Sequence, residues 1–179
     1  MIKLNENAEI VKKIVDLLNE NGFQSTFFVG GCWADDNQET LNYIINNGHE
    51  IGNHGYFHKD HKELNYEQNK REILNTEKMV YALCGAKTTL FAPPSGSYSS
   101  VTLSVADSLG YKTVMWSKDT VDWRDKDTSL IYKRATEGIN NGDMVLMHPK
   151  SWTYSALSDI LKEIKRKNLK VVKVSELIE

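Results

Sequence analysis

Apolar residues at helical spacing begin the chain. Positions 10, 11, 14, 15, 17 and 18 are all isoleucine, valine or leucine, and Gly22 after Asn21 supplies the left-handed stop that such a helix favours. The segment 25–29, "STFFV", is short and rich in aromatic and β-branched residues, which predicts a buried strand. The same order of helix, glycine and strand returns in residues 39–53. The chain therefore begins as alternating helices and strands.

This alternation continues to the C-terminus. Asn65 stands three residues before Gln68, which predicts a capping box at the start of a long helix that ends near Cys84. Six apolar strands joined by helices through short, glycine-bearing links predict parallel βαβ units. The fold class is therefore α/β, either a (β/α) barrel or an open doubly wound sheet. The remaining predicted helices are 100–109, 129–139 and 154–168, and the remaining predicted strands are 89–92, 113–116, 143–147 and 170–174.

The predicted order of elements lacks one strand at its start. The chain begins with a helix, whereas a closed βα barrel begins with a strand, so we expect the first strand to be absent. An absent strand leaves a neighbouring strand edge unpaired, which favours a homodimer or strand exchange.

Composition excludes several classes of function. A chain of 179 residues is long enough for one domain, and its net charge of -2 gives no basic excess for binding nucleic acid. Cys32 and Cys84 are too few and too far apart for a disulfide framework, so we expect free thiols. No segment approaches the roughly 18 apolar residues of a membrane span, and no signal peptide precedes the first helix. The localisation therefore stays open.

Three histidines lie close together in the sequence "GNHGYFHKDH". His54 and His58 are four residues apart, a spacing that on a helix or tight turn points both rings the same way. Imidazole is a donor suited to zinc, cobalt, nickel or iron, and a catalytic site would add a third ligand. Gly55 occupies the place of the zincin glutamate, so this is not that motif. The alternative is a solvated polar loop, and we interpret His61 as a surface residue or a stand-in ligand.

Polar segments also follow three other predicted strands, at the sheet edge where βα folds gather their functional groups. In "SKDTVDW", Asp119 or Asp122 could fix the tautomer of a histidine and raise its pKa, or could simply cap a helix. His148 directly follows an apolar strand, and either packs in the core or pairs with Asp122 across the mouth of the fold. "APPSGSYS" is either a rigid loop or a groove wall with Tyr98 as an aromatic platform for a sugar.

Together, these segments resemble the polysaccharide deacetylases of carbohydrate esterase family 4, the NodB homology domain. The likeness lies in "STFFVGG", "NNGHEIGNHGYFH", "FAPPSGSYS", "VMWSKDTVDW" and "VLMHP", in this order, and makes residues 1–179 a single domain. It implies a distorted (β/α) barrel and a metal-dependent hydrolase that acts on carbon–nitrogen bonds other than peptide bonds. Its substrate would be an acetylated polysaccharide or oligosaccharide, chitin-like, peptidoglycan or xylan, that loses N-acetyl or O-acetyl groups. Members are usually extracellular or associated with the cell wall.

The resemblance also implies roles for individual residues. His54 and His58 would bind the metal, with Zn²⁺ first and Co²⁺ or Ni²⁺ as alternatives. His148 would be the general acid, and Asp122 would tune it. The substrate-binding residues would be Trp123, Pro94, Ser95, Tyr98 and Leu146.

Two departures from the family pattern put hydrolysis in doubt. The family's Thr-Phe-Asp-Asp-Gly motif supplies the base and the third metal ligand, and it lies on the strand that we expect to be absent. Asp35 and Asp36 follow the second strand of the family order, so we interpret them as a surface loop or a helix cap. Ala92 stands where the family carries an arginine that orients the catalytic aspartate, which alanine cannot do. Such losses resemble the sporulation-associated, deacetylase-like subgroup.

These features leave three hypotheses open. The first is a deacetylase-like protein whose hydrolysis is weak or absent. The second is a non-catalytic glycan-binding module that uses the same groove, with Trp123, Tyr98 and Trp152 stacking on sugars. The third is a truncated but otherwise ordinary enzyme, whose aspartate pair would lie upstream of Met1.

Overall fold

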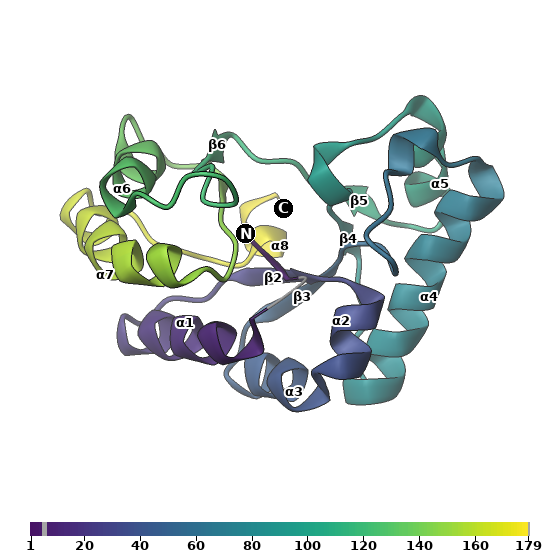
Figure 1. The fold of residues 1–179 in the computed structure, drawn as a ribbon, viewed down its shortest axis with the longest axis horizontal. Helices are drawn as coiled ribbons and strands as arrows, with labels where there is room; N and C mark the ends of the chain where they lie inside the picture. The colour runs from purple at the N-terminus through teal and green to yellow at the C-terminus, as the bar shows by residue number, and fades with distance from the viewer. Residues whose placement is uncertain (5–6, 179) are drawn as a thin grey trace. The chain divides into compact units, whose positions relative to one another are not determined.

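The computed structural model describes residues 1–4 and 7–178, and its helices and strands alternate along the chain (Figure 1). The chain forms two compact units. The first unit comprises Met1–Phe27, Tyr43–Glu50 and Trp116–Glu179, and the second comprises Phe28–Asn42 and Ile51–Met115.

The strands form two sheets. Wherever the register is defined, between β3 and β4, β4 and β5, and β6 and β7, the pairing is parallel. The larger sheet has the order β1-β2-β3-β4-β5, with β1 Ile2–Leu4, β2 Thr26–Val29, β3 Glu50–Asn53, β4 Leu90–Phe91 and β5 Lys112–Thr113, and the smaller sheet pairs β6 Lys118–Asp119 with β7 Val145–Leu146. The predicted α/β class with parallel strands is confirmed.

The expectation that the first strand is absent is wrong. β1 precedes the first helix and pairs with the residue after β7, because Ile2 and Met147 form a parallel bridge. The Lys3 amide donates to the Met147 carbonyl at 3.1 Å, and the Met147 amide donates to the Met1 carbonyl at 3.2 Å. Three residues with a lysine in the middle carry too little alternation to predict a strand. The homodimer was inferred from an unpaired edge, so that inference loses its basis.

The helices follow the predicted order. The capping box of Asn65 and Gln68 is present at the start of α4, as predicted. Asp35 and Asp36 are exposed at the end of α2, which agrees with a surface position. The helices are α1 Ala8–Glu20, α2 Gly31–Asp36, α3 Gln38–Asn46, α4 Tyr66–Cys84, α5 Ser100–Ser108, α6 Thr128–Thr136, α7 Ser151–Arg166 and α8 Val174–Leu177, with short 3₁₀ turns η1 His61–Glu63 and η2 Pro94–Gly96.

Several predicted strands differ from the structure in extent. The segment 170–174 forms no strand, although the Gln24 amide donates to the Val171 carbonyl at 3.3 Å. β4, β5 and β7 are each two residues long, shorter than the apolar runs that predicted them. β6 lies in a polar segment, "KD", that carries no apolar pattern at all. Hydrophobic runs therefore located these strands better than they defined their length.

Each unit has its own apolar packing. In the first unit, α7 packs against both α1 and α6, and the three helices lie together in Figure 1. α1 buries Val11, Ile14, Val15 and Leu18, the stripe that its 3.6-residue period predicts. In the second unit, α4 packs against α2 and α5. A cluster beside β4 consists of Ile73, Phe91, Val105, Ala106 and Tyr111.

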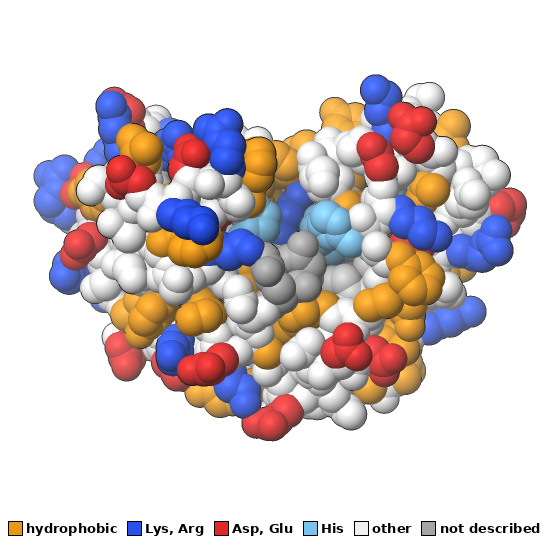
Figure 2. Space-filling model, viewed as in Figure 1, with side chains coloured by type: hydrophobic (Ala, Val, Ile, Leu, Met, Phe, Trp, Pro, Cys, Tyr) orange, Lys and Arg blue, Asp and Glu red, His pale blue; other side chains and the backbone are white. Residues whose placement is uncertain are grey.

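Charged side chains are dispersed over the surface. On the face drawn in Figure 2, Lys and Arg are interspersed with Asp and Glu and form no basic patch. This agrees with the small net charge of -2.

His49 lies in the core of the first unit. Its Nδ1 accepts a hydrogen bond from the Ser25 amide at 3.1 Å, and its ring packs edge-on to Phe27 with the centroids 5.3 Å apart. Its Nε2 has no hydrogen-bond partner among the described residues. Burial, with the charge of Lys173, lowers the pKa of His49 from 6.5 to about 4, so the ring is neutral in the folded state.

We expect His49 to destabilise the fold in acid. Because the folded pKa of about 4 is below the unfolded value, its contribution is complete above pH 6.5 and is lost as the pH falls towards 4. We expect a loss of about 2 to 3 kcal/mol over this range, because a difference of one in pKa corresponds to about 1.4 kcal/mol. Urea unfolding at several pH values would measure it. In His49→Gln, the free energy of unfolding should fall less steeply below pH 6.5 than in the unmodified protein. The same pH dependence in both proteins would contradict the assignment.

Candidate functional site

His54 is held rigidly at the end of β3 in the second unit. Its amide donates to the Val29 carbonyl at 2.9 Å, and its ring is buried. Its Nδ1 lies 2.5 Å from the Ala92 carbonyl oxygen, which can only accept, so Nδ1 carries the proton. The neutral ring therefore has its lone pair on Nε2. A backbone carbonyl on the far nitrogen is the support that metal-binding histidines usually have.

His58 lies beside His54, on a turn rather than a helix. The two rings are edge to face, with centroids 5.1 Å apart and an angle of 77° between their planes. Gly55 and His58 both have positive φ, 73° and 54°, so the chain curls between them. Positive φ is unusual for histidine and points to a constrained turn. The structure thus brings the two predicted metal ligands together.

These two imidazoles fit part of a zinc donor set. Zinc accepts histidine nitrogens, and a catalytic site needs at least one more protein ligand and an open position. In the part of the chain that the structure describes, no group of three or more His, Cys, Asp and Glu side chains could hold a metal ion. The two residues that follow β1 in the sequence are Asn5 and Glu6, which lie outside the described residues.

Glu72 and Asn53 support this turn, and the sequence reasoning missed both. Glu72 is buried on α4, and its Oε2 accepts the Tyr56 and Phe57 amides at 2.9 and 2.8 Å. The Asn53 side chain accepts the Gly55 amide at 3.0 Å and donates to the Ile73 carbonyl at 2.8 Å. One signal could have revealed Glu72, because it falls on the helical stripe that buries residues 69, 73, 76 and 80 of α4.

The interpretation of His61 as a surface residue is wrong. Its ring is fully buried against Phe91, with centroids 5.0 Å apart, and its Nδ1 donates to the Asn69 side-chain oxygen at 2.7 Å. Burial lowers its pKa. Polar neighbours in the sequence, "KDHKE", hid this core position because the chain turns inward for a single residue at η1.

The predicted groove-wall segment is a tight turn of the second unit. Pro94 is buried at the start of η2, whereas Ser95 is exposed and has a φ of 54°. Asp60, from the histidine segment, accepts the Ser97 hydroxyl at 2.5 Å. Tyr98 is 42% exposed, as a sugar platform would need to be. The roles of Pro94, Ser95 and Tyr98 in binding substrate stay predictions.

In the first unit, Asp122 and His148 form the predicted couple. Asp122 is completely buried, and its Oδ1 accepts the His148 Nδ1 proton at 2.7 Å. Its Oδ2 accepts the His148 amide and the Thr153 hydroxyl, both at 2.7 Å. The carboxylate thus fixes the tautomer of the ring and leaves Nε2 as the nitrogen that can exchange a proton. This is the geometry that a general acid or base needs.

A strained turn presents Asp122. Asp119 accepts the Val121 amide at 2.8 Å, so its observed contact is with the turn and not with a histidine. Val121 has a φ of 54°, an outlier for a β-branched residue. Trp152 Nε1 donates to the Asp122 carbonyl at 2.7 Å, an interaction that ties this indole to the turn.

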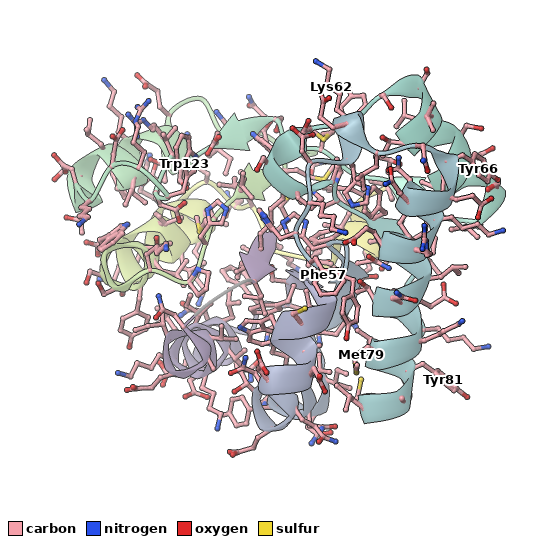
Figure 3. The ribbon with its side chains drawn as sticks, turned by 45° about the vertical axis from the view of Figure 1, so that its right-hand side comes forward. Phe57, Lys62, Tyr66, Met79, Tyr81 and Trp123 are labelled. Atoms are coloured by element: carbon pink, nitrogen blue, oxygen red, sulfur yellow. The ribbon has the colours of Figure 1, made fainter. Side chains whose placement is uncertain are left out.

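Trp123 and Leu146 differ in their exposure. Leu146 is buried in β7, and its carbonyl accepts the Thr120 hydroxyl at 2.8 Å. Trp123 is 56% exposed and has the Arg124 guanidinium 5.7 Å from its ring, while Phe57, in the second unit, is 57% exposed (Figure 3). The binding roles of Trp123 and Leu146 stay predictions. That His54 and His58 share one metal-centred site with Asp122 and His148 also stays a prediction.

Lys3 is a further feature that the sequence reasoning missed. Its side chain is buried in the first unit, with Nζ 4.3 Å from the centroid of the Trp116 ring. Burial lowers its pKa to about 7, although the charge of Asp119 opposes this shift. The signal was a lysine between two apolar residues, Ile2 and Leu4, which we did not interpret as a strand.

The model of one protein family, polysaccharide deacetylase, matches residues 5–114, more than half of the chain. The chain belongs to the polysaccharide deacetylase family. Two relatives from bacilli are similar over almost its whole length. The uncharacterized protein YlxY of Bacillus subtilis is 34% identical over 100% of this chain and 56% of that protein. A peptidoglycan-N-acetylglucosamine deacetylase of Bacillus cereus is 31% identical over 93% of this chain and 80% of that protein.

Solved structures confirm the family fold. BA3943 of Bacillus anthracis, described as a CE4 family pseudoenzyme, has a TM-score of 0.96 and 31% identity over 99% of this chain and 63% of that one. A BA3943 mutant, described as having restored enzymatic activity, has a TM-score of 0.95 and 30% identity over 99% of this chain and 66% of that one. The predicted NodB-type α/β fold is thus correct. This chain spans little more than half the length of YlxY and about two thirds of BA3943.

No helix within residues 1–4 and 7–178 is both long enough and apolar enough to cross a membrane.

We expect Asp122→Ala to destabilise the fold strongly. The change leaves three donors without their buried acceptor, the His148 ring and amide and the Thr153 hydroxyl. Unpaired buried groups of this kind should cost about 3 kcal/mol or more in total. Urea unfolding would measure the loss.

Asp125→Ala is the matched control. Asp125 lies in the same loop as Asp122 and pairs with Arg124 and with Arg134 of α6. The loss of unfolding free energy in Asp125→Ala should be smaller than in Asp122→Ala. Equal losses in the two variants would contradict the central position of Asp122.

Proposed function

We propose that residues 1–179 form a single metal-dependent polysaccharide deacetylase-like domain whose hydrolysis is weak or absent. The observation that carries this proposal is that His54 and His148 are both held in a fixed orientation by an oxygen acceptor on Nδ1. His54 is fixed by the Ala92 carbonyl and lies against His58, and His148 is fixed by Asp122. Membership of the family supports the reaction class, removal of acetyl groups from an N-acetylated or O-acetylated glycan. The similarity to the Bacillus cereus peptidoglycan-N-acetylglucosamine deacetylase supports peptidoglycan as the substrate. Such a substrate would place the protein at the cell wall.

In this proposal each histidine has one task. His54 and His58 would hold the divalent cation, Zn²⁺ first, and His54 would use Nε2 because its Nδ1 donates to the Ala92 carbonyl. The cation supplies Lewis acidity towards the acetyl carbonyl. His148 holds a proton at Nε2 and delivers it to the departing amine or alkoxide, while Asp122 keeps the ring oriented.

Substitutions in two motifs support weak hydrolysis. Ala92 offers a carbonyl to His54 but no side-chain charge, so the arginine fork of the family is lost. Asn5 and Glu6 follow β1 in the sequence, where the family motif has two aspartates. Loss of a general base lowers a rate by about 10² to 10⁴. The pseudoenzyme description of BA3943 agrees with this proposal.

We expect purified protein to retain Zn²⁺. It should release acetate from N-acetylglucosamine oligomers or peptidoglycan at a rate about 10²- to 10⁴-fold lower than that of the Bacillus cereus relative. The double variant His54→Ala, His58→Ala should lose the metal. His148→Ala is its control, because it should retain the metal and lose the residual acetate release. Metal analysis and an acetate assay would check both. Metal retained by the double variant would overturn the proposed ligands.

A gain of function tests the same proposal. Asn5→Asp and Glu6→Asp with Ala92→Arg should raise acetate release while His148→Ala in that background abolishes it. Full activity in the unmodified chain would contradict the weak-hydrolysis proposal.

A non-catalytic glycan-binding module is the second candidate. It is favoured by the exposed aromatic rings at the candidate loops, with Tyr98 42% and Trp123 56% exposed. Such rings stack on sugar faces without chemistry. Oligosaccharide binding that Trp123→Ala weakens, with no acetate released in the presence of Zn²⁺ or Co²⁺, would support this candidate over the first.

A further inference from the structure

A single buried carboxylate fixes the turn that carries both imidazoles. Glu72 reaches from α4 of the second unit, and its side chain is only 5% exposed. One oxygen, Oε2, accepts two consecutive amides of the turn, those of Tyr56 and Phe57, at 2.9 and 2.8 Å. The other, Oε1, lies 3.5 Å from Lys59 Nζ. Glu72 therefore contacts residues on both sides of His58.

The opposite side of the turn is held by α2. The Gly31 amide donates to the Gly55 carbonyl at 3.0 Å, and the Cys32 amide donates to the Tyr56 carbonyl at 3.1 Å. The Gly55 and Tyr56 carbonyls are therefore bound by the start of α2, and the Tyr56 and Phe57 amides by Glu72 on α4. A β-carbon on Gly31 would lie 2.1 Å from the Tyr56 ring, so the turn has no room to shift towards α2.

Without Glu72, the turn would keep its two carbonyl contacts with α2 and the bond from the Gly55 amide to Asn53. Two adjacent amides, those of Tyr56 and Phe57, would lose their buried carboxylate acceptor. His54 would keep its own anchors, the Val29 and Ala92 carbonyls. His58, two residues beyond Tyr56 and with a φ of 54°, has the conformation that depends on the two amide hydrogen bonds to Glu72. Loss of Glu72 should therefore separate the two rings rather than remove either one.

We propose that Glu72 is a positioning residue that sets the spacing of His54 and His58 for a divalent cation, an inference that rests on the proposed metal-binding function. It acts through its two amide hydrogen bonds and does not touch the cation. Groups that orient metal ligands without binding the metal are typically worth 10- to 100-fold in metal affinity. α4, which carries no proposed ligand, would thus contribute a residue that the site requires.

The first experiment measures Zn²⁺ affinity by titration calorimetry in three variants. We expect Glu72→Ala to lower the affinity by about 10- to 100-fold. Glu72→Gln retains an oxygen that can accept both amides, so it should lose less than about tenfold. Glu77→Ala is the matched control, because Glu77 lies on the same helix and its carboxylate accepts the Tyr111 hydroxyl at 2.7 Å rather than an amide of the turn. It should bind Zn²⁺ like the unmodified protein. Thermal unfolding of each variant identifies any that fails to fold.

The second experiment needs no metal. The His54 and His58 rings, 5.1 Å apart between centroids, should give nuclear Overhauser contacts between their ring protons in the unmodified protein. These contacts should persist in Glu72→Gln and Glu77→Ala and disappear in folded Glu72→Ala. This readout responds to ring spacing and not to stability alone.

The two experiments separate the proposals. If the unmodified protein does not bind Zn²⁺ but Glu72→Ala loses the ring contacts, the metal-binding function fails and the positioning role stands. If Zn²⁺ binds equally well to the unmodified protein and to Glu72→Ala, the positioning role is overturned and metal binding stands. Ring contacts that persist in Glu72→Ala would also overturn it, as would equal losses of affinity in Glu72→Ala and Glu77→Ala.

Discussion

The proton on Nδ1 of His54 and the proton on Nδ1 of His148 are both held by oxygen, and the chemistry of the candidate site depends on this. The Ala92 carbonyl holds the first and the Asp122 carboxylate holds the second. The two acceptors differ in charge, and so do the consequences. A neutral carbonyl orients an imidazole that must present a lone pair to a cation, whereas a carboxylate also stabilises the imidazolium that forms when a ring takes up a proton. The same side chain can therefore serve as ligand or as acid, according to its acceptor.

Local pattern predicted the parts of the fold that local forces determine. The strand 50–53 and the capping box at Asn65 were correct because alternation and capping depend on neighbours in sequence. β1 was missed because its partner, Met147, is distant in the chain. The segment 170–174 has the apolar composition of a strand, but composition does not ensure a partner.

The site was predicted in the same uneven way. Residues with a chemical signature, His54, His58, Asp122 and His148, were identified from the sequence, and the structure pairs them as two couples, one in each unit. Residues that act through tertiary contacts were not. Glu72 reads as one acid of a polar helix until α4 packs against α2, and His61 reads as a loop histidine until its ring contacts Phe91. Sequence names the reactive groups more readily than the groups that orient them.

Lys3 gives the first unit a property that no motif describes. Burial holds the pKa of Lys3 at about 7, well below the value of the same amine in the unfolded chain. In the unfolded chain the same amine is charged up to about pH 10. Between these values folding expels a proton, so the folding reaction would acidify an unbuffered solution at mildly alkaline pH. The heat of folding there would vary with the ionisation enthalpy of the buffer.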